Sequence, residues 1–498
     1  MRTIILLFIL CNCIAITKSQ VLFNKNFDYN TNAANGVTNL AIIDDTIYCN
    51  GSHFNFDSLN NYIGGGFGFA KHDISGNLVS FKSFNKVNTN YYLGGNGYGS
   101  NFIHIGNYLY SVGCSEYLNQ YANGLFYKFK MNGDTIFVKT INEGTSLKTI
   151  FNAALNDDNN IIAVANIWRF NSILNRRVSQ TYLVKLDTLG NEIWHKEFGI
   201  EHISEYSYGI KQTIAGGYFL YGRSYAINQY SNFYLIKTDA QGNLLWERNW
   251  GNAFSESIKD VYEMPNGNIL VSGFKAHQLN SSPYDTRAYL AMLNSNGSQR
   301  LWEKLFFEDI YGYSLGKIYR NTDGTYDIWG YENFDDISRP FLMKFSSTFD
   351  SLGIKYYSYW NGAGAQNYLN DIVRMPDKGY IFCGYGWQSN VNEDAWLVRI
   401  DSNGCANEAC TPLAVPEVAP FSVGEGLGMR CYPNPANDEM QIRNIYSGIN
   451  IKIIDAMGSL IFDQKTVSDA MIINTAAYAN GIYMVMVGDT NIKISIKH

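Results

Sequence analysis

The chain has 498 residues, of which 46% are hydrophobic, 15% aromatic and 16% charged. Its net charge of −6 and its lack of a Lys/Arg cluster argue against a nucleic-acid partner, because nothing would neutralise a phosphate backbone. The length allows more than one hydrophobic core, and the high aromatic content suits stacked β-sheets.

The first 19 residues predict an export signal. Arg2 gives a positive start, Ile4 to Ile16 form a mostly apolar run, and small side chains occupy positions −3 and −1 before Gln20. The run is too short for a permanent membrane helix, and no transmembrane segment is expected elsewhere. The alternative is a lipoprotein signal at Cys11 or Cys13, although neither follows a small residue.

Seven copies of one hairpin pattern follow, each with an apolar strand that ends one residue before a fixed position. The residue at that position is Lys71, Lys128, Lys185, Lys237, Met292, Lys344 or Arg399, at steps of 57, 57, 52, 55, 52 and 55 residues. This period suits one four-stranded sheet per repeat and predicts a β-propeller. We expect the Lys or Arg itself to cap its hairpin in solvent.

The fourth repeat shows the strand plan most clearly. Its expected strands are Ser207 to Thr213, Tyr218 to Tyr221, Asn232 to Thr238 and Leu244 to Trp250. Second strands are expected to end at Gly51, Gly113, Asn166, Gly222, Gly273, Gly330 and Gly384. The turns between third and fourth strands are expected at Gly76, Gly133, Gly190, Gly242, Gly297, Gly353 and Gly404, since glycine adopts positive φ easily.

The seventh repeat has no apolar fourth strand after Gly404. Val21–Phe27 resembles a fourth strand such as Glu192–Phe198, so we expect it to complete the last repeat and close the ring. Closure would remove open sheet edges. The prediction is therefore an all-β, seven-bladed propeller over residues 20–404, with six or eight blades as alternatives.

Six cysteines lie beyond the signal, namely Cys49, Cys114, Cys383, Cys405, Cys410 and Cys431. Export permits disulfides, and Cys405 and Cys410 are close enough in sequence for a local bridge. Free thiols are the alternative, because sequence does not give connectivity.

Residues 405–428 are interpreted as a linker with Pro412, Pro416 and Pro420, and residues 429–498 as a second domain. The second domain has short strands at Met440–Ile442, Ile449–Ile454, Leu460–Phe462, Met471–Ile473, Ile482–Val487 and Ile492–Ile496. This spacing is typical of a small immunoglobulin-like β-sandwich.

The tail resembles the type A C-terminal sorting domain of the Bacteroidota type IX secretion system. The matching residues are Tyr432, Pro433, Asn434, Pro435 and Ala436, the Asp455-Ala456-Met457-Gly458 turn, Gly481, Ile482 and Tyr483, and the basic Lys493 and Lys497. The resemblance implies Sec export, recognition of the folded tail by an outer-membrane translocon, and cleavage near the linker. It also implies a product that is secreted or attached to the cell surface. An ordinary adhesive sandwich domain is the alternative.

No catalytic or cofactor motif is recognised in the repeats. Asp239–Trp246 differs from the sialidase Asp-box and from the quinoprotein tryptophan-docking motif in the spacing of Asp, Gly and Trp. Asn156–Asn160 and Asn321–Gly324 offer oxygen atoms to Ca²⁺ but lack a spaced ligand series, and polar turns have the same composition. Triplets that begin at Asp45, Asp57, Asp134, Asp187 and Asp350 resemble O-glycosylation acceptors of that bacterial group.

Two functions are compatible with this sequence. One is a binding or adhesion module whose polar loops Asn171–Gln180, Ala276–Arg287 and Glu332–Ser338 engage an unidentified glycan or protein. The alternative is a polysaccharide hydrolase or lyase, which would need two carboxylates about 5–9.5 Å apart in the central pocket.

Overall fold

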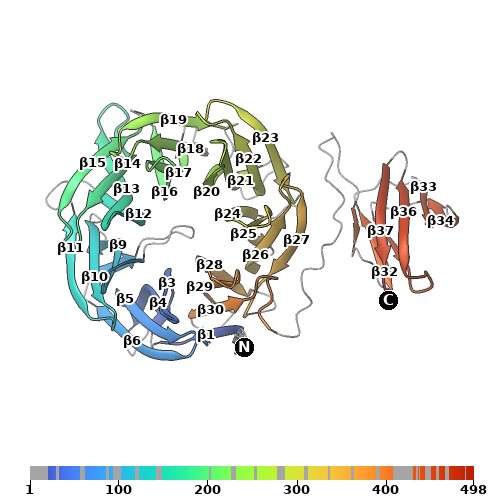
Figure 1. The fold of residues 1–498 in the computed structure, drawn as a ribbon, viewed down its shortest axis with the longest axis horizontal. Coiled ribbons are helices and arrows are strands. Elements are labelled where there is room, and N and C mark those ends of the chain that lie inside the picture. The colour runs from blue at the N-terminus through green and yellow to red at the C-terminus, as the bar shows by residue number, and fades with distance from the viewer. Residues whose placement is uncertain are drawn as a thin grey trace, which may run out of the picture. The chain divides into compact units, whose positions relative to one another are not determined.

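The computed structural model describes residues 21–498 except 30–32, 57–61, 86–88, 94–101, 118–122, 142–147, 201–202, 226–230, 252–254, 277–285, 308–311, 335–336, 361–363, 388–392, 408–429, 433–435, 437, 444–449, 456–458, 466–469 and 488–489. All its regular elements are strands (Figure 1). The chain divides into two compact units, one with strands β1–β19 and β28–β30, the other with β20–β27 and β31–β37. The predicted signal peptide lies outside the described residues.

The first unit contains the first four repeats and the seventh. The first repeat comprises β2 (Ala33–Asn35), β3 (Asn39–Ile43), β4 (Thr46–Phe56), β5 (Tyr62–Asp73) and β6 (Leu78–Asn85). The second comprises β7 (Thr89–Leu93), β8 (Ile103–Ile105), β9 (Tyr108–Tyr117), β10 (Asn123–Lys130) and β11 (Thr135–Ile141). The third comprises β12 (Lys148–Asp157), β13 (Asn160–Asn171), β14 (Arg176–Leu186) and β15 (Glu192–Phe198). The fourth comprises β16 (Ser204–Gln212), β17 (Tyr218–Tyr225), β18 (Ser231–Thr238) and β19 (Leu244–Trp250). The seventh comprises β28 (Gln366–Arg374), β29 (Tyr380–Trp387), β30 (Asp394–Ile400) and β1 (Phe23–Phe27).

The second unit holds two further repeats. The fifth comprises β20 (Glu256–Glu263), β21 (Ile269–Ala276), β22 (Thr286–Leu293) and β23 (Arg300–Phe306). The sixth comprises β24 (Gly312–Arg320), β25 (Tyr326–Phe334), β26 (Ile337–Phe345) and β27 (Ser351–Tyr356). The third, fourth and fifth repeats are four-stranded antiparallel sheets with their strands in chain order, and in Figure 1 β12 and β16 lie inside while β15 and β19 lie outside. In the first and second repeats two short strands, β2 with β3 and β7 with β8, pair with the next strand in place of one, and in the seventh β1 takes the outer position. Such repeated sheets are the blades of a β-propeller, so the predicted fold class is confirmed.

The N-terminal strand completes the seventh repeat, as predicted. β1 runs antiparallel to β30, from Phe23 opposite Arg399 to Phe27 opposite Ala395. Trp396 Nε1 donates a hydrogen bond to Asn24 Oδ1 at 2.7 Å, and the Phe23 ring is buried. An apolar core of the first and seventh repeats, which includes Phe23, covers the joint.

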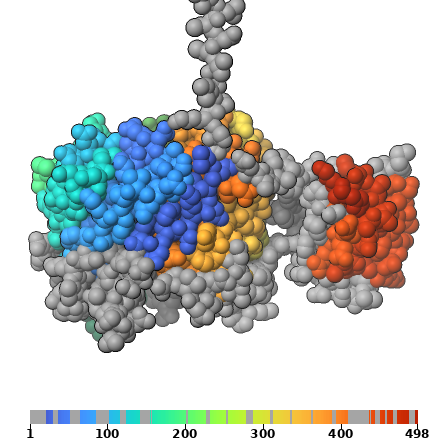
Figure 2. Space-filling model, turned by 90° about the horizontal axis from the view of Figure 1, so that it is seen from below, coloured from blue at the N-terminus to red at the C-terminus, as the bar shows by residue number. Residues whose placement is uncertain are grey.

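The apolar core lies between the sheets of neighbouring repeats. Tyr218, Leu220, Tyr234 and Ile236 of the fourth repeat pack against Ile162, Val164 and Leu183 of the third. The first and second repeats share a similar core, and they form a continuous blue-to-cyan surface in Figure 2. Third strands are buried on both faces, which explains their continuous apolar sequences.

The glycines expected to end the second strands lie inside them, so that expectation is wrong. β17 continues past Gly222 to Tyr225, and Gly222 lies opposite an irregular pairing between Ser207 and Gly209 of β16. A Cβ atom at Gly222 would lie 1.9 Å from the Tyr206 carbonyl oxygen. A Cβ atom at Gly51, Gly273 or Gly384 would likewise lie 1.7 to 2.0 Å from a carbonyl oxygen.

The sixth repeat also departs from the expected turn. Gly353 lies within β27, and the left-handed turn position is taken by Phe349 with φ of +63°. The Phe349 ring is buried, with its centroid 5.1 Å from Trp302 and 4.7 Å from Tyr326. Its packing offsets the cost of positive φ in a residue that has a Cβ atom.

The C-terminal strands form a two-sheet sandwich, which confirms the predicted architecture. Its strands are β31 (Arg430–Tyr432), β32 (Glu439–Arg443), β33 (Asn450–Asp455), β34 (Leu460–Lys465), β35 (Ala470–Asn474), β36 (Gly481–Val487) and β37 (Thr490–Ile496). One sheet has the order β31-β32-β35 and the other β34-β33-β36-β37. Met440, Ile453, Val485 and Ile494 are among the buried side chains of their common core.

Cys405 is disulfide-bonded, and Cys410, its expected partner, lies outside the described residues. Cys49, Cys114 and Cys383 are buried free thiols. Among the described residues, no helix has the length and apolar character to cross a membrane.

Candidate functional site

A group of aromatic side chains surrounds one guanidinium where β16 begins and β17 ends. We call Trp168, Tyr206, Tyr208, Arg223 and Tyr225 the Arg223 cluster. All five are partly exposed, although each lies on a strand whose other face is buried. They come from two neighbouring repeats, because Trp168 belongs to β13 and the others to β16 and β17.

The geometry of the Arg223 cluster places ring faces and edges around the cation. The guanidinium carbon of Arg223 lies 4.9 Å from the ring centroid of Tyr225 and 5.3 Å from that of Tyr208. Tyr206 contacts Tyr225 edge-on at 5.3 Å and Trp168 at 5.9 Å. Burial raises the pKa of Tyr208 to about 12 although the nearby Arg223 opposes the shift, so this phenol stays neutral at physiological pH.

A second aromatic group occupies the same place in the seventh repeat. The rings of Tyr368, Tyr385 and Trp387, which we call the Tyr385 cluster, have centroids 5.0 to 6.2 Å apart and interplanar angles of 13° to 31°. Burial raises the pKa of the nearby Glu393 carboxyl to about 7. The charge of Glu393 contributes to the raised pKa of Tyr385.

The two clusters are equivalent in register. Tyr206 pairs with Arg223, the residue that follows Gly222 in the second strand, and Tyr368 pairs with Tyr385, the residue that follows Gly384. Both clusters therefore lie at the same end of their sheets, where the first strand starts and the second ends. Partly exposed aromatic rings with a few polar groups are the usual lining of a ligand site.

Near these residues lies Glu205, a carboxyl whose pKa is strongly shifted. Burial, with a smaller effect of Glu247, raises its pKa to about 8. Its Oε1 accepts a hydrogen bond from the Ile200 amide at 2.9 Å, and Tyr234 donates to Glu247 at 2.7 Å. Glu205 is 0% exposed, however, so a polysaccharide cannot reach it as a general acid. This pair does not support the hydrolase alternative.

The two turns whose oxygen atoms were weighed as calcium ligands have other contacts in the structure. Asp157 accepts hydrogen bonds from Lys185 at 2.6 Å and Gln212 at 3.1 Å, while Asp323 caps its own turn through Thr325. No group of three or more metal-ligating side chains occurs in the described parts of the chain. These contacts are those of ordinary hairpin turns.

The Lys/Arg position of the repeats does not uniformly face solvent as expected. Lys128 is buried, lies 4.2 Å from the Tyr108 ring and donates to the Thr188 carbonyl of the next repeat. Arg399 is also buried and reaches Asp377 at 3.0 Å and the Ile74 carbonyl at 3.2 Å. The cations at these two positions therefore connect repeats.

Of the three loops expected to carry contacts, Asn171–Gln180 is mostly strand. β13 and β14 extend through it to a turn at residues 172–175, with Phe170 and Ile173 exposed near the tip. Residues 277–285 and 335–336 of the other two lie outside the described residues.

The residues matched to the tail motif are spread along the sandwich. Gly481 and Tyr483 lie in β36, where the Tyr483 hydroxyl donates to the Ala479 carbonyl at 2.8 Å. Lys493 lies in β37 opposite Met484, and Lys497 is exposed after it. Tyr432 ends β31. Pro433, Asn434, Pro435 and Gly458 lie outside the described residues.

Both ends of the sandwich sequence are joined by backbone hydrogen bonds. The Ala436 amide donates to Ser495 at 2.8 Å, and the Lys497 amide donates back to Ala436 at 2.9 Å. Residues 430–498 match the family model described as secretion system C-terminal sorting domain. This domain is a type IX secretion sorting domain. The sorting domain identifies the chain as an exported protein destined for the cell surface or the medium.

Beyond the sorting domain, relatives give little further information. The search of curated proteins found no match. Among solved structures, PorZ, a surface component of the type IX secretion system of Porphyromonas gingivalis, shares 12% identity and a TM-score of 0.31, over 93% of this chain and 70% of that one. Synechocystis apocarotenoid oxygenase shares 10% identity and a TM-score of 0.43, over 76% of this chain and 91% of that one.

The aromatic clusters could not be found from local spacing in the sequence. Trp168 and Tyr206 lie 38 positions apart and in different repeats, so only the packing of neighbouring sheets brings them together. The one available signal is the alternation in Tyr206-Ser207-Tyr208 and Arg223-Ser224-Tyr225, which places large side chains on one face.

Proposed function

We propose that the chain is an exported binding protein whose propeller, residues 20–404, recognises a glycan through the aromatic clusters of its fourth and seventh repeats. The domain at 429–498 would direct the chain to the type IX machinery, and residues 405–428 would link the two. Export by the Sec route through residues 1–19 belongs to the same proposal, as does either release or surface attachment.

The carrying observation is the equivalent placement of the two clusters at one end of their sheets. Packing within a core would bury these rings, yet all of them stay partly exposed in strands whose neighbouring residues are buried. Flat rings with a polar edge suit sugars, because they cover an apolar sugar face while their hydroxyl and N–H groups reach sugar hydroxyls.

Binding of the purified chain to an oligosaccharide array, followed by calorimetry, tests this function. We expect Tyr206→Ala and Tyr385→Ala each to weaken binding of a glycan that the wild-type chain retains, by about tenfold or more for a central aromatic contact. Phe170→Ala, which removes an exposed ring outside both clusters, is the matched control and should leave affinity unchanged.

Product analysis of the same incubations separates binding from the hydrolase or lyase alternative. The binding proposal requires the glycans to be recovered intact. Shortened or unsaturated products from wild-type chain would support the enzymatic function instead.

A further inference from the structure

We infer that the Arg223 cluster binds the carboxylate-bearing sugar of an acidic saccharide, such as a uronic acid unit. This inference rests on the proposed glycan-binding function and adds the class of ligand. The carboxylate would pair with the guanidinium while the sugar ring contacts the surrounding tyrosines.

The cation of Arg223 is packed against aromatic rings. In the described part of the chain its contacts are Tyr208 and Tyr225, and its buried Nε has no hydrogen-bond partner there. Other arginines differ: Arg169 forms an ion pair with Glu197, and Arg339 pairs with Glu332 at 2.6 Å. A guanidinium with an aromatic setting and, among the described residues, no carboxylate partner favours an anionic ligand.

The charge of the cluster comes from this single side chain. Burial raises the pKa values of Tyr208 and Tyr225, so both phenols remain neutral and can donate hydrogen bonds. Guanidinium groups bind carboxylates through two parallel N–H donors, which adds orientation to attraction. The tyrosines then add contact area for the rest of the sugar.

The equivalent position in the seventh repeat provides an internal contrast. Tyr385 stands where Arg223 stands, and the Glu393 carboxyl lies close enough to influence the pKa of Tyr385. Among the residues that the structure describes around Tyr385, a carboxylate ligand would meet an acidic group in place of a cation. The preference for an acidic sugar should therefore belong to the Arg223 cluster and not to the Tyr385 cluster.

The test measures affinity of the full chain, by calorimetry, for galacturonate, glucuronate and N-acetylneuraminate oligosaccharides and for the methyl ester of each. We expect at least one acid to bind about tenfold or more tightly than its ester, in keeping with one charge-assisted hydrogen bond. Arg223→Gln should remove this preference. Arg169→Gln, whose guanidinium already has a carboxylate partner, should keep it.

Two results would separate failure of the inference from failure of the proposed function. If esters bind as well as acids, or if Arg223→Gln retains the preference, the acidic-ligand inference is wrong while glycan binding stands. If no saccharide binds, charged or neutral, both are wrong. Should Arg223→Gln fail to fold, the salt dependence of wild-type binding decides: acid affinity must fall with ionic strength while ester affinity does not.

Discussion

Gly222 shows how a single missing Cβ atom permits the close approach of two strands. A methyl group there would lie 1.9 Å from the Tyr206 carbonyl oxygen, far inside van der Waals contact. The irregular pairing between Ser207 and Gly209 creates this contact by pushing the backbone of β16 toward β17. The glycine is required by packing and not by the end of a strand.

Gly222→Ala should therefore destabilise the propeller by about 1–3 kcal/mol, as overpacking does in a dense interior. Urea unfolding followed by tryptophan fluorescence measures the change. Gly216→Ala serves as a comparison, because that turn glycine has positive φ but open space around it. A Gly222 variant as stable as wild type would show that the two strands separate without cost to admit a Cβ atom.

Glu205 gives the molecule a pH dependence of predictable sign. Burial raises its folded-state pKa from 4.5 to about 8, so the folded chain prefers the protonated carboxyl. The contribution of protonated Glu205 to the free energy of unfolding is fully present below about pH 4.5 and is lost as pH rises through 8. The reason is that the unfolded chain loses this proton at a lower pH than the folded chain. Stability should thus decline across this window.

Glu205→Gln should flatten that decline, since an amide cannot ionise and can still accept the Ile200 hydrogen bond. We expect the variant to exceed the wild-type chain at pH 8 by more than about 1 kcal/mol, the equivalent of one pKa unit. Urea midpoints between pH 5 and 8 provide the measurement. Parallel curves for the two proteins would show that the carboxyl titrates normally.

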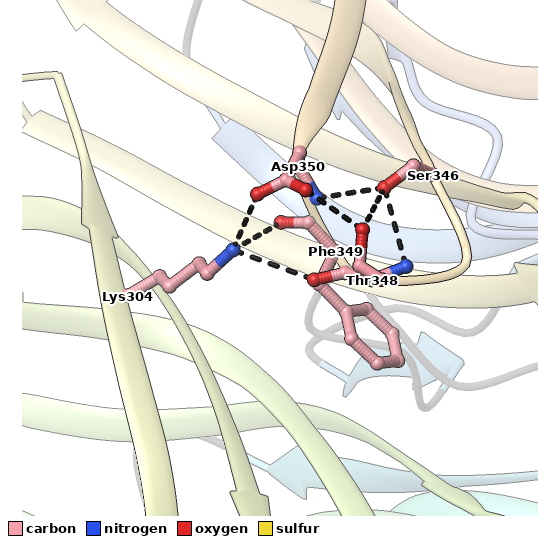
Figure 3. Close-up of polar contacts among 5 residues, drawn as sticks. All are labelled: Lys304, Ser346, Thr348, Phe349 and Asp350. Atoms are coloured by element: carbon pink, nitrogen blue, oxygen red, sulfur yellow. Dashed lines mark hydrogen bonds and ion pairs between the residues drawn. The ribbon is translucent and has the colours of Figure 1, made fainter. Parts of the chain in front are cut away.

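At the scale of elements, the fourth strands carry a cation at one register position, opposite the residue that lies two before the fixed position of the third strand. These cations are Lys25, Lys82, Lys139, Lys196, Arg248, Lys304 and Lys355. Lys82, Lys139 and Lys304 each reach a turn of the next repeat. Figure 3 shows the case of Lys304, whose Nζ donates to the Phe349 carbonyl at 3.0 Å and to Asp350 at 2.9 Å. Lys139 reaches Asn191 at 2.8 Å in the equivalent turn.

Hydrogen bonds within these turns fix the backbone that the cations contact. Ser346 Oγ accepts hydrogen bonds from the Thr348 and Asp350 amides, and Asp187 and Asp239 do the same in the third and fourth repeats. The turn carbonyls are thereby held in a fixed position that faces the preceding repeat. The hydrogen bond from Lys304 also lowers the pKa of Asp350.

Lys304→Met keeps most of the aliphatic stem and removes the hydrogen bonds. We expect a loss of about 1 kcal/mol, discounted because the side chain is partly exposed. Lys82→Met is the comparison: Lys82 reaches the exposed Asp134, whereas Lys304 also donates to the Phe349 carbonyl, so the loss at Lys82 should be smaller. Equal losses at both sites would contradict a contribution from the carbonyl contact of Lys304.

The strands could largely be predicted because the same sequence pattern recurs in every repeat. A third strand with aromatic-Leu-apolar sequence recurs where both faces are buried, as at Tyr234, Leu235 and Ile236. The missing fourth strand of the last repeat could be found by counting, and β1 supplies it. The turn at Phe349 could not, because the preference for glycine there is overridden by packing against Trp302 and Tyr326.

At the scale of the whole molecule, the sorting domain and the repeats carry separate tasks. The sandwich has its own core and its own pair of sheets. Its residues were matched by motif, whereas the Arg223 cluster depends on contacts between repeats that no motif records. The secretion route could therefore be predicted from the sequence, whereas the proposed ligand site could be found only in the three-dimensional structure.

Deletion of residues 429–498 should leave a folded propeller that accumulates in the periplasm. Cell fractionation, with circular dichroism of the purified fragment, measures both parts of this expectation. Arrival of the truncated chain at the surface or in the medium would remove the sorting role, and an unfolded fragment would show that the two parts depend on each other.

We propose that the partly exposed rings at the start of β16 and the end of β17 form a ligand site. A crystal structure of the chain with its tightest-binding oligosaccharide tests this directly. We expect a sugar ring against Tyr206 and Tyr225, within hydrogen-bond reach of Arg223. A sugar bound elsewhere, with these side chains facing only solvent, would contradict it.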